Sequence, residues 1–389
     1  GWTRPAADGG TPLTGYRVTA SPGGVVALAG PNATSVAVGP LTNGASYSFS
    51  VSALNAMGTG SPATSPPPSS SPRLAGVERV GGAGPVETAV ALSRRAFSGA
   101  ADVVIARSDD YADALAASAL AGDLSAPLLL TPSGSLSPSV ASEVRRLRAT
   151  TAYLAGGTTA LSAGVEAGLR AAGASVTRFA GVNRFDTARL LAERVGGRSV
   201  YVAEGANADP NRGWADAVAV SGLAAFQARP VLLTNAGELP AETRAALLSL
   251  GATSATVVGG TVAVSTAVAS AVGDPDDNGV AQVSVSRLGG ATRFETARLL
   301  ADRALSAGAG VHRLWMATLT DWPDALVAGP AAANKGAVVL LLDGGDLANS
   351  TAASSWLAAQ NRRFLEAVVV GDTASITSGV ETAVSALLR

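Results

Sequence analysis

Short apolar runs alternate with alanine- and leucine-rich stretches of helical period through most of this chain. Residues 103–106 and 127–130 are such apolar runs, and each is followed by a stretch of helical period, at 113–120 and 139–147. Strands that are apolar on both faces are typical of a parallel sheet covered by helices on both sides. The pattern therefore predicts α/β layers in this part of the chain.

The pattern is different near the start of the chain. Residues 15–20 and 47–53 alternate apolar and small polar residues, with glycine, proline and asparagine between the two segments. This alternation indicates strands with one buried and one exposed face, as in a β-sandwich. Four prolines and four serines at 65–72 favour a semi-rigid linker. We therefore assign residues 1–67 to an all-β unit and 68–75 to the linker.

The region after the linker contains one unit of sequence three times. Each copy opens on Arg-x-x-Gly and leads to an acidic residue, Thr and Ala. An aromatic residue, a small residue or proline, Asp and Ala follow, and an apolar strand then leads to Val-Gly-Gly or a close variant. The copies are 76–175, 176–284 and 285–389. The three signatures begin at Arg79, Arg178 and Arg287, at Tyr111, Trp214 and Trp322, and at Leu154, Val257 and Val369.

Composition limits the classes of function. The 389 residues include 28 basic and 29 acidic side chains, a net charge of −1, so the chain lacks the positive field of a nucleic-acid or anionic-membrane binder. Cysteine is absent, which removes disulfides and thiolate metal sites. The longest apolar runs are far shorter than the ~18 residues that a membrane span needs. We therefore expect no nucleic-acid partner and no membrane span.

The residues that most enzymes use for catalysis are scarce. His312 is the only histidine, so neither a histidine-based triad nor a multi-histidine zinc site can form. The sequence also has neither a Gly-x-Ser-x-Gly elbow nor a P-loop. We expect no enzymatic activity and no cofactor. Carboxylate catalysis, for instance by the pair Asp109 and Asp110, stays open as an alternative.

One segment resembles the start of a calcium-binding loop. Asp274–Gly279 places Asp, Asp, Asn and Gly at positions 1, 3, 5 and 6 of an EF-hand-like loop. Position 12 would be Val285, where a bidentate Glu is needed. We therefore expect a solvated turn here and no bound metal.

Residues 1–67 resemble a fibronectin type III domain. The resemblance rests on Trp2 and Pro5, on Asp8–Tyr16, on Leu41 six residues before Tyr47, and on Ala53–Gly58. It implies that Trp2 is the core tryptophan of the second strand and that Tyr47 is the corner tyrosine that bonds back to the backbone. It also implies that the first strand precedes this chain, which does not open on Met, so we expect the chain to be part of a longer protein.

The order of signatures in the three copies is similar to the cell wall-binding repeat type 2 of Gram-positive surface proteins. The similarity covers roughly residues 77 to 389. It implies three tandem Rossmann-like α/β repeats with parallel sheets in a pseudo-threefold arrangement. It also implies a monomer located outside the cell, at the cell wall, that is held non-covalently by an anionic secondary wall polymer. One departure is Pro85-Val86 in the first copy, where the others have Arg184-Phe185 and Arg293-Phe294.

Side chains that recur among the copies are the candidates for polymer binding. A planar guanidinium can hold a phosphate or carboxylate by two parallel hydrogen bonds. The alternative for the arginines is internal pairing with the Asp of their own repeat or cover of the seam between repeats, and the alternative for each Asp is a favourable position at a helix start. The candidates are Arg79, Arg178, Arg184, Arg287, Arg293, Thr88, Thr187, Thr296, Asp113, Asp216 and Asp324.

Two other functions stay open beside wall anchoring. A structural spacer or adhesion stalk that binds no polymer would be favoured if the recurring arginines were fully paired within the protein. An enzyme, or an accessory region of a wall hydrolase, would be favoured by an acidic site present in one repeat alone. Charge balance does not distinguish these functions.

Overall fold

The structure is a computed structural model that describes residues 1–7, 9–39, 41, 45–65, 74, 76–209, 211–310, 312–360 and 363–388. It contains two compact units. The N-terminal unit includes Gly1–Ala75, and the α/β unit includes Gly76–Ala359 and Glu366–Leu387. The predicted linker at 68–75 lies, apart from Leu74, outside the described residues.

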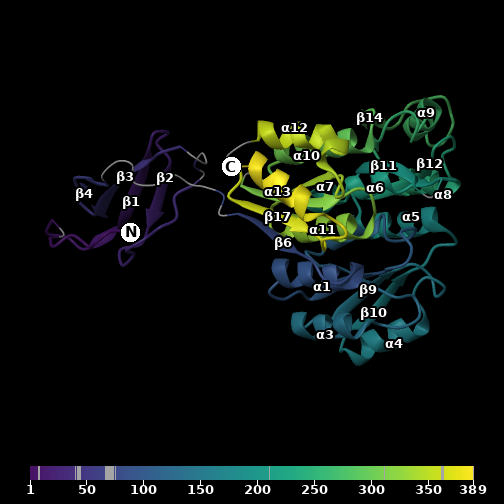
Figure 1. The fold of residues 1–389 in the computed structure, drawn as a ribbon, viewed down its shortest axis with the longest axis horizontal. Helices are drawn as coiled ribbons and strands as arrows, with labels where there is room; N and C mark the ends of the chain where they lie inside the picture. The colour runs from purple at the N-terminus through teal and green to yellow at the C-terminus, as the bar shows by residue number, and fades with distance from the viewer. Residues whose placement is uncertain are drawn as a thin grey trace. The chain divides into compact units, whose positions relative to one another are not determined.

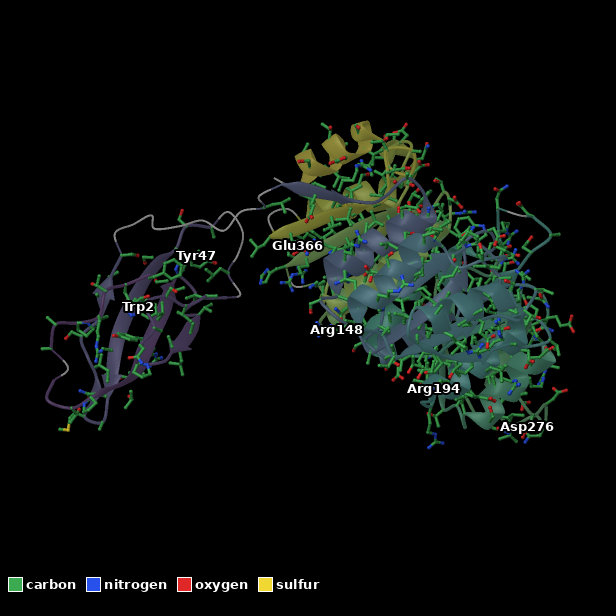
Figure 2. The ribbon with its side chains drawn as sticks, turned by 90° about the horizontal axis from the view of Figure 1, so that it is seen from below. Trp2, Tyr47, Arg148, Arg194, Asp276 and Glu366 are labelled. Atoms are coloured by element: carbon green, nitrogen blue, oxygen red, sulfur yellow. The ribbon has the colours of Figure 1, made fainter. Side chains whose placement is uncertain are left out.

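The described strands of the N-terminal unit form an antiparallel sheet. They are β1 (Leu13–Ser21), β2 (Val26–Ala29), β3 (Ser48–Asn55), β4 (Gly58–Thr59) and β5 (Ala63–Thr64), in the order β2-β1-β3-β4 with β5 also paired to β3. The prediction of an all-β unit is thereby confirmed. The ring of Trp2 packs at 5.1 Å from that of Tyr16, and Tyr47 is also buried, so both predicted core residues lie in this unit (Figure 2).

The α/β unit contains three four-stranded sheets in which every neighbouring pair is parallel, as predicted. The first is β10 (Ser175–Phe179), β9 (Thr151–Ala155), β7 (Asp102–Arg107) and β8 (Leu128–Thr131). The second is β12 (Val231–Asn235), β11 (Ser199–Ala206), β13 (Ser254–Val258) and β14 (Ser284–Leu288). The third is β16 (Val338–Leu342), β15 (Arg313–Thr318), β17 (Glu366–Val370) and β6 (Val77–Val80).

Helices connect the strands in the same order in each repeat. Repeat 1 contains α1 (Pro85–Ala96), α2 (Ala117–Asp123), α3 (Pro138–Leu147) and α4 (Ala163–Ala171). Repeat 2 contains α5 (Arg184–Val195), α6 (Ala215–Ala219), α7 (Ser221–Gln227), α8 (Ala241–Ser249) and α9 (Thr266–Gly273). Repeat 3 contains α10 (Arg293–Ser306), α11 (Pro323–Asn334), η1 (Leu347–Ser350), α12 (Thr351–Ala359) and α13 (Ser378–Leu387). Among the described residues, no helix is both long and apolar enough to cross a membrane.

The first strand of each repeat belongs to the sheet of another repeat. Strand β10, which opens repeat 2, pairs with β9 of repeat 1, and β14, which opens repeat 3, pairs with β13 of repeat 2. Strand β6, which opens repeat 1, pairs with β17 near the end of the chain (Figure 1). The three repeats are thereby closed into one cycle by backbone hydrogen bonds.

Three equivalent helices pack against one another where the repeats meet. Helices α2, α7 and α11 each contact the other two. Glycine allows this close approach, because a Cβ atom on Gly122 would lie 2.1 Å from the carbonyl oxygen of Ala225, and one on Gly329 would lie 2.7 Å from the hydroxyl oxygen of Ser221. Small residues therefore hold the three repeats together at their centre.

Replacing Gly122 with Ala tests this packing. Alanine alone favours a helix over glycine by about 0.5–1 kcal/mol, but here its methyl group would collide with the backbone of α7. We expect Gly122→Ala to lower the free energy of unfolding by about 1–3 kcal/mol in denaturant titration. Gly134→Ala is the matched control, because a Cβ atom there meets nothing within 4 Å. Equal stability of both variants would contradict the proposed contact.

A buried carboxylate joins two helices of repeat 1. Glu143 on α3 is fully buried and accepts hydrogen bonds from the hydroxyl of Ser93 at 2.5 Å, from Nη2 of Arg146 at 2.7 Å and from Nε of Arg94 at 3.2 Å. Burial alone would raise the pKa of Glu143, but the hydrogen bonds and positive charges of these partners outweigh it and lower the pKa.

The lowered pKa of Glu143 makes the folded state sensitive to acid. A carboxyl whose pKa is lower in the folded state contributes stability above its ordinary value of 4.5, and this contribution is lost as the pH falls through the folded value. We expect Glu143→Gln to lower the free energy of unfolding by about 2–3 kcal/mol at pH 7, and to reduce the further loss seen at pH 3. The exposed Glu238→Gln is the control; an acid response of Glu143→Gln identical to that of the native chain would contradict this account.

Candidate functional site

The three sequence signatures meet at the junctions between repeats. At the junction of repeats 3 and 1, the carboxylate of Asp324 on α11 lies over Gly371, where a Cβ atom would be 2.3 Å from Oδ2. Gly371 has a φ of 102°, so both its backbone conformation and this contact require glycine. The same arrangement recurs with Asp113 over Gly156 and with Asp216 over Gly259, where the corresponding distances are 2.6 and 2.2 Å.

Recurring threonines lie where the chain crosses from one repeat to the next. Thr88, Thr187 and Thr296 are each only 1% exposed, and each hydroxyl accepts a hydrogen bond from a backbone N–H, that of Gly82, Gly181 or Gly290. The hydroxyl of Thr88 also bonds to Asp324, and that of Thr296 bonds to Asp216. The threonines therefore fix the crossover from one repeat to the next.

The three recurring aspartates do not all lie at the same place relative to the nearest helix. Asp216 lies in the first turn of α6 and Asp324 in that of α11, as predicted. The expectation that Asp113 opens a helix is wrong, because α2 begins at Ala117 and Asp113 lies in the preceding turn.

Three of the candidate arginines bind the backbone of the preceding repeat. Nη1 of Arg79, Arg178 and Arg287 donates to two successive carbonyl oxygens at the end of the neighbouring strand, at 2.7–3.2 Å. Arg79 also pairs with Glu381 at 2.6 Å, and Arg178 with Glu166 at 3.0 Å. The expected internal pairing therefore exists, but its acceptors are these carbonyls and glutamates instead of the recurring aspartates.

The other two candidate arginines lie over aromatic rings. Arg184, at the start of α5, lies 5.4 Å from the ring centre of Tyr111 and donates through Nη1 to the carbonyl of Gly205 at 2.9 Å. Arg293, at the start of α10, lies 5.2 Å from the ring centre of Trp214 and donates through Nη2 to the carbonyl of Asn211 at 2.7 Å. Cation–π contact holds both guanidinium groups in place at a junction.

A cavity of about 480 Å³ lies at the junction of repeats 2 and 3. Glu204, Arg212, Asp216 and Arg293 line it, together with the turn at 260–263. Burial and, after it, the charge of Glu204 raise the pKa of Asp216 to about 6, although Arg293 and Arg212 act in the opposite direction. Two carboxylates and two arginines therefore line this cavity.

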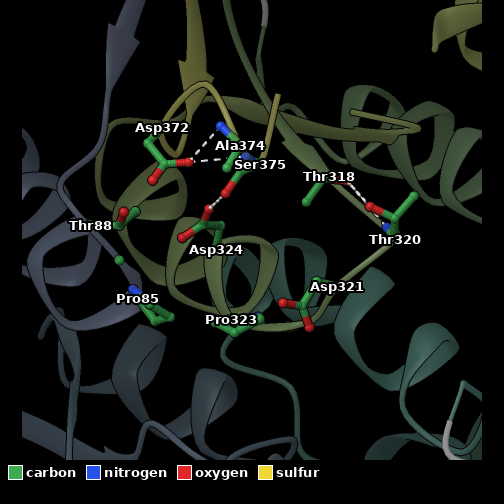
Figure 3. A pocket seen from close by; sticks show the side chains of 11 residues that line it. Pro85, Thr88, Thr318, Thr320, Asp321, Pro323, Asp324, Asp372, Ala374 and Ser375 are labelled. Carbon is green, nitrogen blue, oxygen red and sulfur yellow. Dashed lines mark hydrogen bonds between the residues drawn. The ribbon is translucent and has the colours of Figure 1, made fainter. Parts of the chain in front are cut away.

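A smaller cavity of about 250 Å³ lies at the junction of repeats 3 and 1 (Figure 3). Asp324, only 6% exposed, accepts a hydrogen bond from the hydroxyl of Ser375 at 2.6 Å, and burial raises its pKa. Asp321 and Asp372 also line the cavity, and Pro85 stands where the other repeats have an arginine. No arginine is among its described lining residues.

Comparison with known families identifies the three repeats. Residues 79–166, 178–269 and 287–381 match the family model of cell wall binding domain 2 (CWB2), and residues 1–70 match that of the fibronectin type III domain. The chain belongs to the CWB2 family. The CWB2 repeats include every junction described above, and both predicted family resemblances are confirmed.

Curated relatives share the CWB2 region. The chain is 30% identical over 304 residues to N-acetylmuramoyl-L-alanine amidase LytC of Bacillus subtilis (strain 168), which covers 78% of this chain and 57% of the relative. It is 26% identical over 316 residues to the amidase enhancer of the same organism, covering 80% of this chain and 40% of the relative. The chain thus spans about half the length of these relatives.

Two solved structures have the same fold. Cwp6 from Clostridium difficile has a TM-score of 0.71 at 20% identity, covering 97% of this chain and 64% of that one. Cwp8 from the same organism has a TM-score of 0.67 at 23% identity, covering 88% of this chain and 59% of that one. At these identities the likeness concerns the fold alone.

Sequence reasoning missed two residues of the cavity between CWB2 repeats 2 and 3. Glu204 and Arg212 are absent from the recurring signatures, because Glu204 stands where the other repeats have Arg107 and Thr318, and Arg212 belongs to a loop that is longer in repeat 2. Nine residues separate Glu204 from Trp214, whereas three separate Arg107 from Tyr111 and Thr318 from Trp322. This longer loop was the signal available in the sequence.

The acidic loop at Asp274–Gly279 forms a turn in which a side chain accepts hydrogen bonds from backbone N–H groups of the same loop. The carboxylate of Asp274 accepts hydrogen bonds from the N–H groups of Asn278 and Gly279, at 3.3 and 2.8 Å, and Asp276 is exposed at the edge of the CWB2 unit (Figure 2). Across the described part of the chain, no group of three or more His, Cys, Asp or Glu residues is placed to hold a metal ion.

The pairing of Arg287 predicts that it stabilises the junction. We expect Arg287→Ala to lower the free energy of unfolding by about 2–3 kcal/mol, because the carbonyls of Gly259 and Gly260 lose a charged donor. Denaturant titration against Arg145→Ala, an exposed arginine on α3, measures this effect. Unchanged stability with impaired wall binding would instead make Arg287 a ligand contact.

Proposed function

We propose that this chain anchors a surface or secreted protein non-covalently to the bacterial cell wall, outside the cell, by binding an anionic secondary wall polymer. The observation that carries the proposal is the presence of three CWB2 repeats closed into one cycle, with an arginine-lined cavity at one junction. The wall amidase and the amidase enhancer among its relatives support a role at the wall. The proposed role is binding without catalysis, by a monomer with internal pseudo-threefold symmetry.

Local geometry must supply the attraction for an anion, because the whole chain has a net charge of only −1. Guanidinium groups held at a cavity wall can offer two parallel hydrogen bonds to an oxyanion. Arg293 and Arg212 lie at such a wall, and Arg184 has an equivalent position at the junction of repeats 1 and 2. We assign these three arginines to polymer contact.

The other candidate residues maintain the structure of the junctions around this binding surface. Arg79, Arg178 and Arg287 hold the strand ends, and Thr88, Thr187 and Thr296 hold the crossovers. Asp113, Asp216 and Asp324 form the floors of the junctions over their glycines. In this proposal, substitution of these arginines and threonines affects binding mainly through the shape of the junctions.

A spacer or adhesion stalk without polymer binding is the second candidate function. The internal pairing of Arg79, Arg178 and Arg287 favours it, because these side chains donate to carbonyl oxygens within the protein. A third candidate function is that of an accessory region of a wall hydrolase, because one relative is an N-acetylmuramoyl-L-alanine amidase.

Co-sedimentation of the 389-residue chain with purified Gram-positive cell walls tests anchoring. The walls are used before and after acid extraction of their secondary polymers. We expect the protein to pellet with intact walls and to stay in solution with extracted walls. Pelleting that survives extraction would exclude a secondary polymer as the ligand, and the absence of pelleting with any wall would favour the stalk.

The double variant Arg184→Ala with Arg293→Ala tests the assigned contacts. Each lost charge-assisted hydrogen bond weakens binding by about 1.5–3 kcal/mol, so we expect at least about tenfold weaker wall binding with an unchanged circular dichroism spectrum. Arg145→Ala is the matched control. Undiminished binding by the folded double variant would remove both residues from the site.

A further inference from the structure

The cavity between repeats 2 and 3 has an internal balance of charge. Two arginines, Arg212 and Arg293, line the cavity together with the carboxylates of Glu204 on β11 and Asp216 on α6. Nη2 of Arg212 lies 3.7 Å from Oε2 of Glu204, and Glu204 is 4% exposed. Two positive and two negative groups thus share a cavity of about 480 Å³.

Both arginines retain donors that a ligand can use. Within the described residues, Arg212 makes contacts only through Nη2, with Glu204 and with the carbonyl of Val262 at 3.2 Å. Arg293 directs Nη2 at the carbonyl of Asn211 and Nη1, at 3.5 Å, toward that of Leu319. A guanidinium has five N–H donors, so both side chains can bind a further acceptor.

An anion that enters this cavity disturbs the balance. Its charge would lie near two carboxylates in a partly buried space, where repulsion is screened less than in water. The groups that face Asp216 are Glu204, Arg212, Arg293 and the hydroxyl of Thr296, and Glu204 is already held by Arg212 and by Nδ2 of Asn207. Uptake of a proton by Asp216 is the change that restores neutrality.

We propose that this cavity binds a singly charged oxyanion of the wall polymer and that Asp216 takes up one proton when the anion binds. The inference rests on the proposed function and adds to it both a place and a dependence on pH. Binding and proton uptake then favour each other, because each lowers the electrostatic cost of the other.

The other junctions differ at the positions that matter. Equivalent positions near the carboxyl ends of β11, β7 and β15 hold Glu204 in repeat 2, Arg107 in repeat 1 and Thr318 in repeat 3. Arg107 is paired with Asp109 at 2.8 Å, and the cavity beside Thr318 has Pro85 in place of an arginine. Glu204 therefore gives the junction of repeats 2 and 3 a second carboxylate beside the recurring aspartate, where repeat 1 has an arginine and repeat 3 a threonine.

Asp216 changes its protonation state between pH 8 and pH 5. Burial and the neighbouring Glu204 raise the pKa of Asp216 to about 6, so this carboxyl is mainly ionised at pH 8 and mainly protonated at pH 5. An anion in the cavity raises its proton affinity further. Wall binding should therefore tighten as the pH falls from 8 to 5.

Wall pelleting at pH 5 and pH 8 measures this coupling. We expect the native chain to bind about tenfold more tightly at pH 5, the effect of a tenfold rise in the proton affinity of Asp216 on binding. Asp216→Asn imitates the protonated form and should bind at pH 8 about as tightly as the native chain binds at pH 5. Asp123→Asn, an exposed carboxylate on α2, is the control and should keep the native pH profile.

Glu204→Gln provides a second variant in case Asp216→Asn does not fold. Without the charge of Glu204, the proton affinity of Asp216 falls, so binding at pH 8 should tighten and the midpoint of the remaining pH dependence should move to lower pH. Equal native binding at pH 5 and pH 8, or a native pH profile in folded Asp216→Asn or Glu204→Gln, would overturn this inference and leave wall anchoring intact. Absence of native binding at both pH values would overturn the proposed function as well.

Discussion

Pairing of the first strand of each CWB2 repeat with the sheet of the preceding repeat is the constraint on which this structure depends. Each four-stranded sheet therefore requires residues from two repeats. Strands β6 and β17, which are the first and the last strands of the α/β unit in the sequence, pair with each other in one sheet. A single repeat would leave an open sheet edge and an unpaired strand. The three repeats therefore form one cooperative unit, in which Arg79, Arg178 and Arg287 secure each exchanged strand to the carbonyls beside it.

The same exchange creates the junctions where function is proposed. The chain leaves one sheet, crosses a glycine-containing loop and begins a helix on the next, so a helix start, a strand end and a buried aspartate meet three times. The scaffold is repeated, but the side chains on it are not. Glu204, Arg107 and Thr318 occupy equivalent places, as do Arg293, Arg184 and Pro85, and this gives the junctions different charges.

Much of the fold was predictable because its signals are local. The apolar runs at 103–106 and 127–130 became β7 and β8, the helical stretch at 139–147 became α3, and the alternating segments at 15–20 and 47–53 became β1 and β3. The strand exchange was not predictable, because self-similarity gives the period of a repeat but not which repeat a strand pairs with. A recurring arginine also looks the same in a sequence whether it faces a ligand or a carbonyl group.

The candidate site was only partly predictable for a related reason. The signatures directed attention to residues shared by all three copies, and these are mostly the residues that form the junctions, such as Thr88 and Asp324. Chemical difference resides in residues that one copy has and the others lack. Arg212 belongs to the longer loop of repeat 2, and its proximity to Glu204 depends on how that loop folds.

The most direct test of this account is a crystal structure of the chain with a soluble fragment of extracted wall polymer. The account predicts an anionic group of the fragment within hydrogen-bond distance of Arg212 and Arg293, beside Asp216. A fragment bound elsewhere on the CWB2 unit, with this cavity filled only by water, would contradict it.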